Sequence, residues 1–160
     1  MKGPGPDDRR TVGWREWLAL PDLGLPLLHV KVDTGAETSA LHALNVEPYR
    51  EGGAPWVRFR VEPLLPDRAP SVVCAAPVCD TRVVTSSSGH EENRLVIRTS
   101  LRLGLRVGAP TWPVEITLAD RSPMLHPMLL GREALAGRLL VDAAAEYLLG
   151  DVTDAAVFYR

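Results

Sequence analysis

The chain has 160 residues, 46% of them hydrophobic and 24% charged, with a formal net charge of -2. This length fits one ordinary domain, and a net-acidic chain without a block of Lys or Arg lacks the charge pattern of a general nucleic-acid binder. No apolar run approaches the roughly 18 residues that span a bilayer, and the opening MKGPGPDDRR has no apolar segment typical of a secretory signal. We therefore expect a soluble, cytoplasmic domain that binds neither nucleic acid nor membranes.

Short β-rich runs separated by turns follow one another along the chain. Strands are expected over residues 14–18, 27–32, 56–61, 82–85, 95–101, 111–118 and 128–130, with a proline-rich loop at 64–70 and either a helical turn or a short strand within 38–44. A short helix is expected at 132–136, capped by Gly137. Residues 1–11 are expected to form a flexible N-terminal tail, and residues 151–160 a C-terminal tail or edge strand. This pattern predicts an all-β sandwich or barrel.

The two cysteines, Cys74 and Cys79, have the spacing Cys-x4-Cys. This spacing is neither the Cys-x2-Cys of a redox motif nor a complete zinc set. We expect both to be small buried hydrophobic residues.

The segment Val32-Asp33-Thr34-Gly35-Ala36 places a carboxylate at the end of an apolar strand, before a hydroxyl residue and a glycine. Glycine permits a tight turn that a side chain would obstruct, and Thr34 can hold that turn by bonding to the backbone. A carboxylate in a fixed loop can activate water when a second carboxylate lies beside it, because the pair then shares one proton. Asp33 is therefore the candidate catalytic residue.

A second motif, Met128-Leu129-Leu130-Gly131-Arg132, is an apolar strand closed by a glycine and followed by the expected helix. Together with Asp33-Thr34-Gly35-Ala36 it resembles a lobe of the retroviral-type (retropepsin) aspartic peptidases. The resemblance implies that Leu130 and Gly131 pack behind the Asp33 loop. It also implies an ion pair between Glu37 and Arg132 that stabilises the active-site floor.

Further motifs resemble one bacterial family over nearly the whole chain. They are Gly13-Trp14-Arg15-Glu16-Trp17, Thr38 to Ala43, Trp56 to Phe59, Ser88-Gly89-His90 with Arg94, Asp120-Arg121-Ser122 with Met124, Pro127 to Leu135, and Val141-Asp142. The family is labelled ATP-dependent zinc protease, is associated with RimK/LysX ligases, and includes RimB-type proteins. The resemblance implies an all-β, retropepsin-like (acid protease) closed barrel over residues 12–150, a single lobe with one short helix. It also implies partnership with an ATP-grasp ligase that adds glutamate-like residues to protein or peptide ends.

The family label names zinc and ATP, and the sequence supports neither. His90-Glu91-Glu92-Asn93-Arg94 begins like the zinc motif His-Glu-x-x-His, but Arg94 replaces the second histidine. The Gly-x4-Gly-Lys-Ser/Thr loop that binds nucleotide phosphates is missing. A three-dimensional metal site of His42, His90 and Cys74 remains an alternative, but we expect no metal and no cofactor.

The hairpin from Val83 to Ile97 is expected to be a flap that closes over substrate. Its tip would be Ser86-Ser87-Ser88-Gly89, and Ser88, Gly89, His90 and Arg94 are its candidate substrate-binding residues. This charged tip differs from the apolar, glycine-rich flap of the viral enzymes and favours a charged substrate such as a glutamate-rich tail. The candidate carboxylate-binding arginines are Arg82, Arg94, Arg98, Arg121 and Arg132.

One lobe carries one Asp-Thr-Gly, whereas catalysis of the pepsin type needs two aspartates. The sequence therefore predicts a homodimer in which Asp33 of each subunit meets at the two-fold axis. Such a dimer would hydrolyse peptide bonds in a peptide or protein substrate. Two alternatives remain: a non-catalytic peptide-binding or ligase accessory module on the same fold, and a metal-dependent hydrolase.

Overall fold

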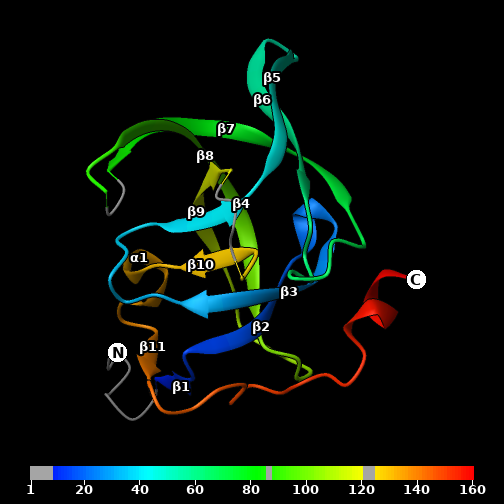
Figure 1. Ribbon diagram of the computed structural model, residues 1–160, viewed down its shortest axis with the longest axis vertical. Helices are drawn as coiled ribbons and strands as arrows, with labels where there is room; N and C mark the ends of the chain where they lie inside the picture. Colours follow the sequence, from blue (N-terminus) through cyan, green and yellow to red (C-terminus); the bar gives the residue numbers. More distant parts are fainter. Residues whose placement is uncertain (1–8, 86–87, 121–124) are drawn as a thin grey trace, which may run out of the picture.

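The computed structural model describes residues 9–85, 88–120 and 125–160 of the chain, and most of them lie in strands (Figure 1). The strands are β1 (Arg10–Val12), β2 (Arg15–Leu20), β3 (Leu25–Val32), β4 (Ser39–His42), β5 (Leu44–Glu51), β6 (Ala54–Val61), β7 (Val72–Thr85), β8 (Glu91–Leu103), β9 (Thr111–Ala119), β10 (Met128–Leu130) and β11 (Leu139–Val141). The described helical elements are α1 (Arg132–Leu135) and the 3-10 helices η2 (Pro21–Leu23) and η3 (Ala155–Tyr159). None of these is long and apolar enough to cross a membrane. The predicted all-β fold with one short α-helix is therefore confirmed.

Nine strands form one sheet in the order β2-β3-β10-β4-β9-β8-β7-β6-β5, and β2 also pairs with β8. This additional pairing closes the six strands from β2 to β8 into a ring. Strands β7, β6 and β5 continue from β8 as an antiparallel extension, and the β5–β6 hairpin projects from the body at the top of Figure 1. Strands β1 and β11 pair in parallel as a separate small sheet.

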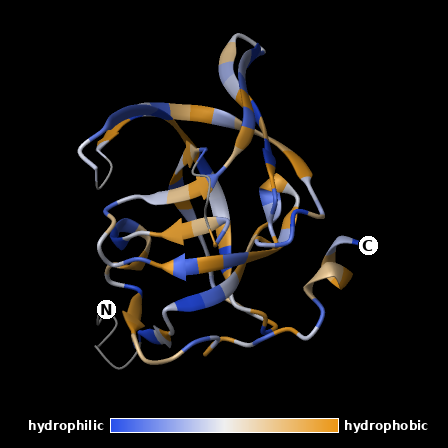
Figure 2. Cartoon of the chain, in the orientation of Figure 1, coloured by the Kyte–Doolittle hydropathy of each residue, from blue (hydrophilic) through white to orange (hydrophobic). Residues whose placement is uncertain are grey.

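Hydrophobic side chains alternate with polar ones along the strands of the ring. On β8, Ile97, Leu101 and Leu103 are buried, whereas the intervening Arg98 and Arg102 are exposed. Figure 2 shows the corresponding bands of hydrophobic and hydrophilic residues. Burial of apolar surface stabilises the fold by about 25 cal/mol per Å². The β2–β8 pairing closes the ring around these apolar side chains, and their burial in turn stabilises the closed ring.

Strand β10 lies between β3 and β4 in the sheet and positions the candidate site. It pairs in parallel with β3, so that Leu130 lies opposite Val32. It pairs antiparallel with β4, so that Leu129 lies opposite Ala40. The residue after β10, Gly131, is therefore adjacent to the residue after β3, Asp33.

Some elements differ from those that the sequence predicts. Of the two alternatives for residues 38–44, the structure has the short strand β4, whereas Val72–Thr85 form one continuous strand that is longer than the strand expected at 82–85. Strand β5 was not expected, because most of its side chains are exposed and Pro48 lies within it. It is an edge strand, where proline is tolerated.

Parts of both ends of the chain form regular secondary structure. Residues 1–8 of the expected N-terminal tail lie outside the described residues, but Arg10 and Thr11 belong to β1. Residues 151–160, expected as a C-terminal tail or an edge strand, contain the 3-10 helix η3. The Tyr159 hydroxyl donates a hydrogen bond to the carbonyl oxygen of Leu27, which anchors this end to β3.

Candidate active site

Asp33 follows the last residue of β3 and starts a tight turn. Its N–H donates to the carbonyl oxygen of Leu130 at 2.9 Å, and its carbonyl oxygen accepts from the N–H of Ala36 at 3.3 Å. One carboxylate oxygen, Oδ1, accepts from the N–H of Gly35 at 3.0 Å, as in an Asx turn. The turn thus holds a half-buried carboxylate at the end of a sheet strand.

Gly35 supplies room rather than an unusual backbone angle. Gly35 is not one of the described glycines whose backbone angle φ is positive. A Cβ atom at this position would lie 3.2 Å from Oδ1 of Asp33. A side chain would therefore crowd the oxygen that the Gly35 N–H binds.

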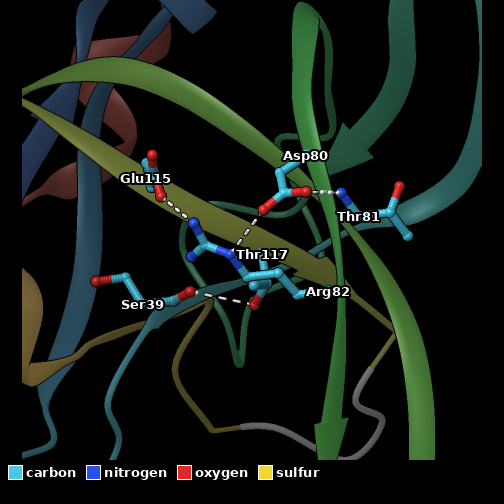
Figure 3. Close-up of polar contacts among 6 residues, drawn as sticks. All are labelled: Ser39, Asp80, Thr81, Arg82, Glu115 and Thr117. Carbon is cyan, nitrogen blue, oxygen red and sulfur yellow. Dashed lines mark hydrogen bonds and ion pairs between the residues drawn. The ribbon is translucent and has the colours of Figure 1, made fainter.

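The segment after β10 packs directly behind the Asp33 loop. The N–H of Gly131 donates to Oγ of Ser39 at 3.0 Å, and this serine is buried. The carbonyl oxygen of Ser39 in turn accepts from the Thr117 hydroxyl at 3.1 Å, which ties β4 to β9 (Figure 3). The buried serine was not singled out from the sequence, because its role depends on two partners from distant strands.

Arg132 supports the Asp33 loop through backbone oxygens. Its Nη1 donates to the carbonyl oxygens of Thr34 and Gly35, both at 3.1 Å. The ion pair with Glu37 that the resemblance implies is not formed among the described residues. The Glu37 side chain is exposed and lines the cleft described next, so the arginine meets the loop's carbonyls instead.

A cleft of about 550 Å³ opens beside the Asp33 loop. We call its two sides the floor and the roof. The floor residues are Asp33, Gly35, Ala36, Glu37, Thr38, Ala40, Leu129 and Glu133, and the roof residues are Arg82, Val83, Val84, Thr85 and Arg94. The roof is the end of the β7–β8 hairpin, which arches over the side of the molecule that carries α1 and the β3–β4 loop (Figure 1). The floor carries carboxylates and the roof carries guanidinium groups.

Arg82 is paired with acids on two neighbouring strands. Its Nε lies 3.1 Å from Oδ2 of Asp80, and its Nη2 binds Oε2 of Glu115 (Figure 3). These contacts, with the Glu115 hydrogen bond largest, raise the pKa of the Arg82 guanidinium. The charge of Arg82 is therefore neutralised within the protein.

Arg94 lies directly opposite Arg82 in the β7–β8 pairing, but its environment differs. Its side chain is only 6% exposed. Its Nη2 lies 3.5 Å from Oε2 of Glu92, whose side chain is 51% exposed. Its buried Nε has no hydrogen-bond partner among the described residues.

The structure therefore gathers some of the predicted site residues and leaves others apart. Asp33, Gly35, Ala36, Glu37 and Arg94 line one cleft, while Thr34, Leu130, Gly131 and Arg132 lie in or behind the loop that forms its floor. Ser88, Gly89 and His90 are exposed and do not line the cleft. Ser86, Ser87 and Arg121 lie outside the described residues. The floor acid Glu133 was not predicted, although it directly follows the Gly131-Arg132 motif.

The residues present do not fit the zinc ion that the family label names. Within residues 9–85, 88–120 and 125–160, no three His, Cys, Asp or Glu side chains are grouped so that they could hold a metal. The alternative set of His42, Cys74 and His90 is therefore not brought together. Of the two cysteines, Cys74 is buried as expected, whereas Cys79 is exposed.

The chain is similar to known proteins both in sequence and in structure. Residues 11–151 match the sequence model of the family described as "RimB-like: Retropepsin-like aspartic endopeptidase RimB". A crystallised protein of unknown function from Legionella pneumophila has a similar structure, with a TM-score of 0.70 and 25% sequence identity. That similarity covers 88% of this chain and 98% of the Legionella chain.

Two curated relatives have a different name. The chain is 43% identical over 145 residues to a "Probable alpha-L-glutamate ligase" of Desulfotalea psychrophila. It is 46% identical over 141 residues to a protein of the same name from Parasynechococcus marenigrum. These alignments cover 91% and 88% of this chain but only 30% and 29% of the relatives. The chain thus spans less than a third of the length of these relatives.

Proposed function

Because this chain belongs to the RimB-like family of retropepsin-like aspartic endopeptidases, we propose that it hydrolyses peptide bonds with Asp33 from two copies of the chain. The placement of Asp33 carries the proposal. Its carboxylate is held by the Gly35 N–H at the floor of a cleft, beneath a β-hairpin. A peptide in this cleft would lie between the aspartate and the hairpin, with water largely excluded.

Two copies are needed because each chain supplies one Asp-Thr-Gly turn. In a two-fold symmetric dimer the same residue contributes from both sides. Two carboxylates about 3 Å apart cannot both ionise, so they share one proton. The ionised Asp33 then accepts a proton from water as the oxygen attacks the scissile carbonyl carbon, while the protonated Asp33 donates its proton to the carbonyl oxygen. Collapse of the tetrahedral intermediate breaks the C–N bond, and an Asp33 carboxyl returns a proton to the departing amine.

We propose glutamate-rich protein or peptide tails as substrates and an ATP-grasp ligase as a functional partner. Relatives named as alpha-L-glutamate ligases contain a segment homologous to this chain within a polypeptide about three times as long. In these relatives the homologous segment is covalently linked to the rest of a protein named as a ligase. This linkage favours action of both parts on the same acidic tail. The ligase would extend the tail, and the present chain would shorten it.

The test is hydrolysis of a tetraglutamate peptide, followed by mass spectrometry of the products. We expect cleavage by the wild-type chain and its loss in Asp33→Asn, while Asp22→Asn, an exposed aspartate in η2, retains it. An excess of Asp33→Asn protein should also inhibit the wild type, because mixed dimers hold one working carboxylate. Full activity of a chain that stays monomeric during turnover would contradict the two-copy mechanism.

A non-catalytic binding module is the second candidate, because a single chain presents only half of the proposed dyad. It predicts that the wild type binds acidic peptides without cleaving them and that Asp33→Asn leaves their affinity unchanged. A chelator arm in the hydrolysis assay tests the metal-dependent alternative. Cleavage that persists in excess chelator and disappears in Asp33→Asn would exclude that alternative.

A further inference from the structure

Arg94 is a buried cation whose hydrogen-bonding capacity is largely unused. A guanidinium group has five N–H donors and stays charged in proteins. Removing such a charge from water is unfavourable unless it is paired and hydrogen-bonded. Arg94 is 6% exposed, yet its one ion pair among the described residues is a 3.5 Å contact to the half-exposed Glu92, and its Nε is unpaired. The side chain is therefore poised for a further acceptor.

Comparison with Arg82 shows that this property is specific to one position of the roof. The two arginines are directly paired across β7 and β8 and line the same cleft. Arg82 has Asp80 on one side and Glu115 on the other, so its charge is satisfied. Among the residues that the structure describes, Arg94 has only Glu92 as an acidic partner. A negatively charged ligand entering the cleft would therefore bind to Arg94 rather than to Arg82.

We propose that Arg94 is the specificity-determining residue of the cleft and binds a carboxylate group of the bound peptide. The inference rests on the proposed function, because it takes the cleft to be where peptides bind. Carboxylate is the chemical match for the planar fork of a guanidinium, which it can bind through two parallel hydrogen bonds. Burial strengthens the interaction, because the surrounding dielectric constant is lower than that of water. The bound carboxylate would replace Glu92, whose side chain can turn towards solvent.

The distribution of charge fixes how the peptide would lie. The floor presents Asp33, Glu37 and Glu133, which repel a carboxylate. An acidic group of the peptide would therefore point to the roof and Arg94, leaving the peptide backbone facing Asp33. The carboxylate could belong to an acidic side chain or to the C-terminus of the peptide. Both have the same chemistry, and the experiment below separates them.

The test measures peptide binding by calorimetry on the full chain carrying Asp33→Asn, so that hydrolysis does not interfere. The probes are acetyl-tetraglutamate amide, acetyl-tetraglutamine amide and acetyl-tetraglutamine with a free C-terminal carboxylate. We expect one of the two carboxylate-bearing probes to bind about tenfold or more tightly than the neutral amide, as for a charged hydrogen-bonded pair. Preference for the first identifies a side-chain carboxylate, and preference for the last identifies the C-terminus.

Variants at position 94 then assign the preference. Arg94→Gln should abolish it while leaving binding of the neutral peptide unchanged, and Arg94→Lys should restore part of it, since lysine keeps the charge but not the fork. Arg102→Gln, which removes an exposed arginine of the same strand, should leave the preference intact. Equal binding of all three probes, failure of the carboxylate probes to bind, or an equal loss for all probes in Arg94→Gln would overturn the proposal. Hydrolysis by the wild type is measured separately, so that failure of the peptidase mechanism is distinguishable from failure of this inference.

Discussion

Gly131 lies so close to Thr38 that a Cβ atom on the glycine would be 2.6 Å from the carbonyl carbon and oxygen of Thr38. The neighbouring atoms belong to the backbone, which cannot rotate away as a flexible side chain can. This contact seats the end of β10 against the chain that follows the Asp33 turn. The glycine of the second sequence motif is thus required by close packing of two backbone segments.

Replacing Gly131 by alanine should destabilise the protein by about 2–3 kcal/mol, within the range for overpacked sites. Urea unfolding gives the free energy of unfolding directly. The matched control is Gly137→Ala, where φ is +75° and no atom lies within 4 Å of the added Cβ. That variant should lose about 1 kcal/mol from backbone strain alone. Equal losses in the two variants would show that the contact with Thr38 relaxes without cost.

Arg132→Met should loosen the Asp33 turn while leaving the fold intact. The variant keeps an apolar stem but loses the two donors to the carbonyl oxygens of Thr34 and Gly35. We expect stability to fall by about 1 kcal/mol and amide hydrogen exchange at Gly35 to become faster. Glu37→Gln serves as the control, because Glu37 forms no ion pair with Arg132 among the described residues. If Glu37→Gln increased exchange as much as Arg132→Met, an ion pair between the two would have to form in solution.

Glu16→Gln should cost more than its small change in shape suggests. Glu16 is fully buried, and its carboxylate accepts backbone N–H groups from Gly13 at 2.7 Å, Leu148 at 2.9 Å and Leu149 at 3.1 Å. An amide group turns one acceptor into a donor that faces N–H groups, so the free energy of unfolding should fall by roughly 1–3 kcal/mol.

The control for this change is Glu146→Gln. Glu146 pairs with Arg15 at 2.7 Å but is 45% exposed, and such surface pairs contribute about 0–1 kcal/mol. Thermal or urea unfolding of both variants at neutral pH makes the comparison. A loss in Glu16→Gln no larger than that in Glu146→Gln would contradict the importance of the buried carboxylate.

The stability of the fold should decline in acid partly because of His29. Its ring centroid lies 4.6 Å from that of His126, and its Nε2 shares a 2.8 Å hydrogen bond with the Tyr147 hydroxyl. Burial, followed by the positive charges of His126 and Arg15, lowers the pKa of His29 to about 4, against an opposing effect of Asp151. The unfolded chain binds this proton near pH 6.5, whereas the folded chain binds it only near pH 4. Stability is therefore highest above pH 6.5, falls as the pH drops towards 4, and changes no further from this source below that.

Unfolding temperatures from pH 8 to pH 4 test this dependence. His29→Gln should flatten the acid decline, and the difference between the two proteins at pH 8 gives the separate effect of altered packing. An unchanged slope in His29→Gln would assign the decline to other groups. Peptidase assays in this pH range should be accompanied by a check that the protein remains folded.

The parts of the site that depend on local sequence could be predicted. Asp33-Thr34-Gly35 follows an apolar strand, and Leu130-Gly131 closes another. Each motif combines a hydrophobic pattern with a residue that stops it. These patterns also predicted most ring strands, because one side of each strand faces the core. Strand β5 lacks such a buried face, which explains why its pattern gave no signal.

The roles of individual charged residues could not be predicted, because they depend on pairing between strands. Arg82 and Arg94 have similar sequence surroundings, and only the β7–β8 register and the position of Glu115 on β9 decide which charge is satisfied. For Arg132, the sequence motifs offer two kinds of partner in the Asp33 loop, the Glu37 carboxylate and the backbone carbonyl oxygens of Thr34 and Gly35. The choice of the carbonyls follows from the path of the Asp33 loop.

The position of β10 between β3 and β4 has a consequence for synthesis of the protein. Arg132 supports the carbonyl of a residue 98 positions earlier, and Leu130 pairs with the strand that ends before Asp33. During translation, Asp33 leaves the ribosome long before these supports are made, and such distant pairings form late because they must close a long loop. The aspartate turn therefore acquires its shape only after most of the chain has emerged. An incomplete chain that lacks residues 128–132 would therefore carry the Asp-Thr-Gly sequence without the hydrogen bonds with Leu130 and Arg132 that hold its turn.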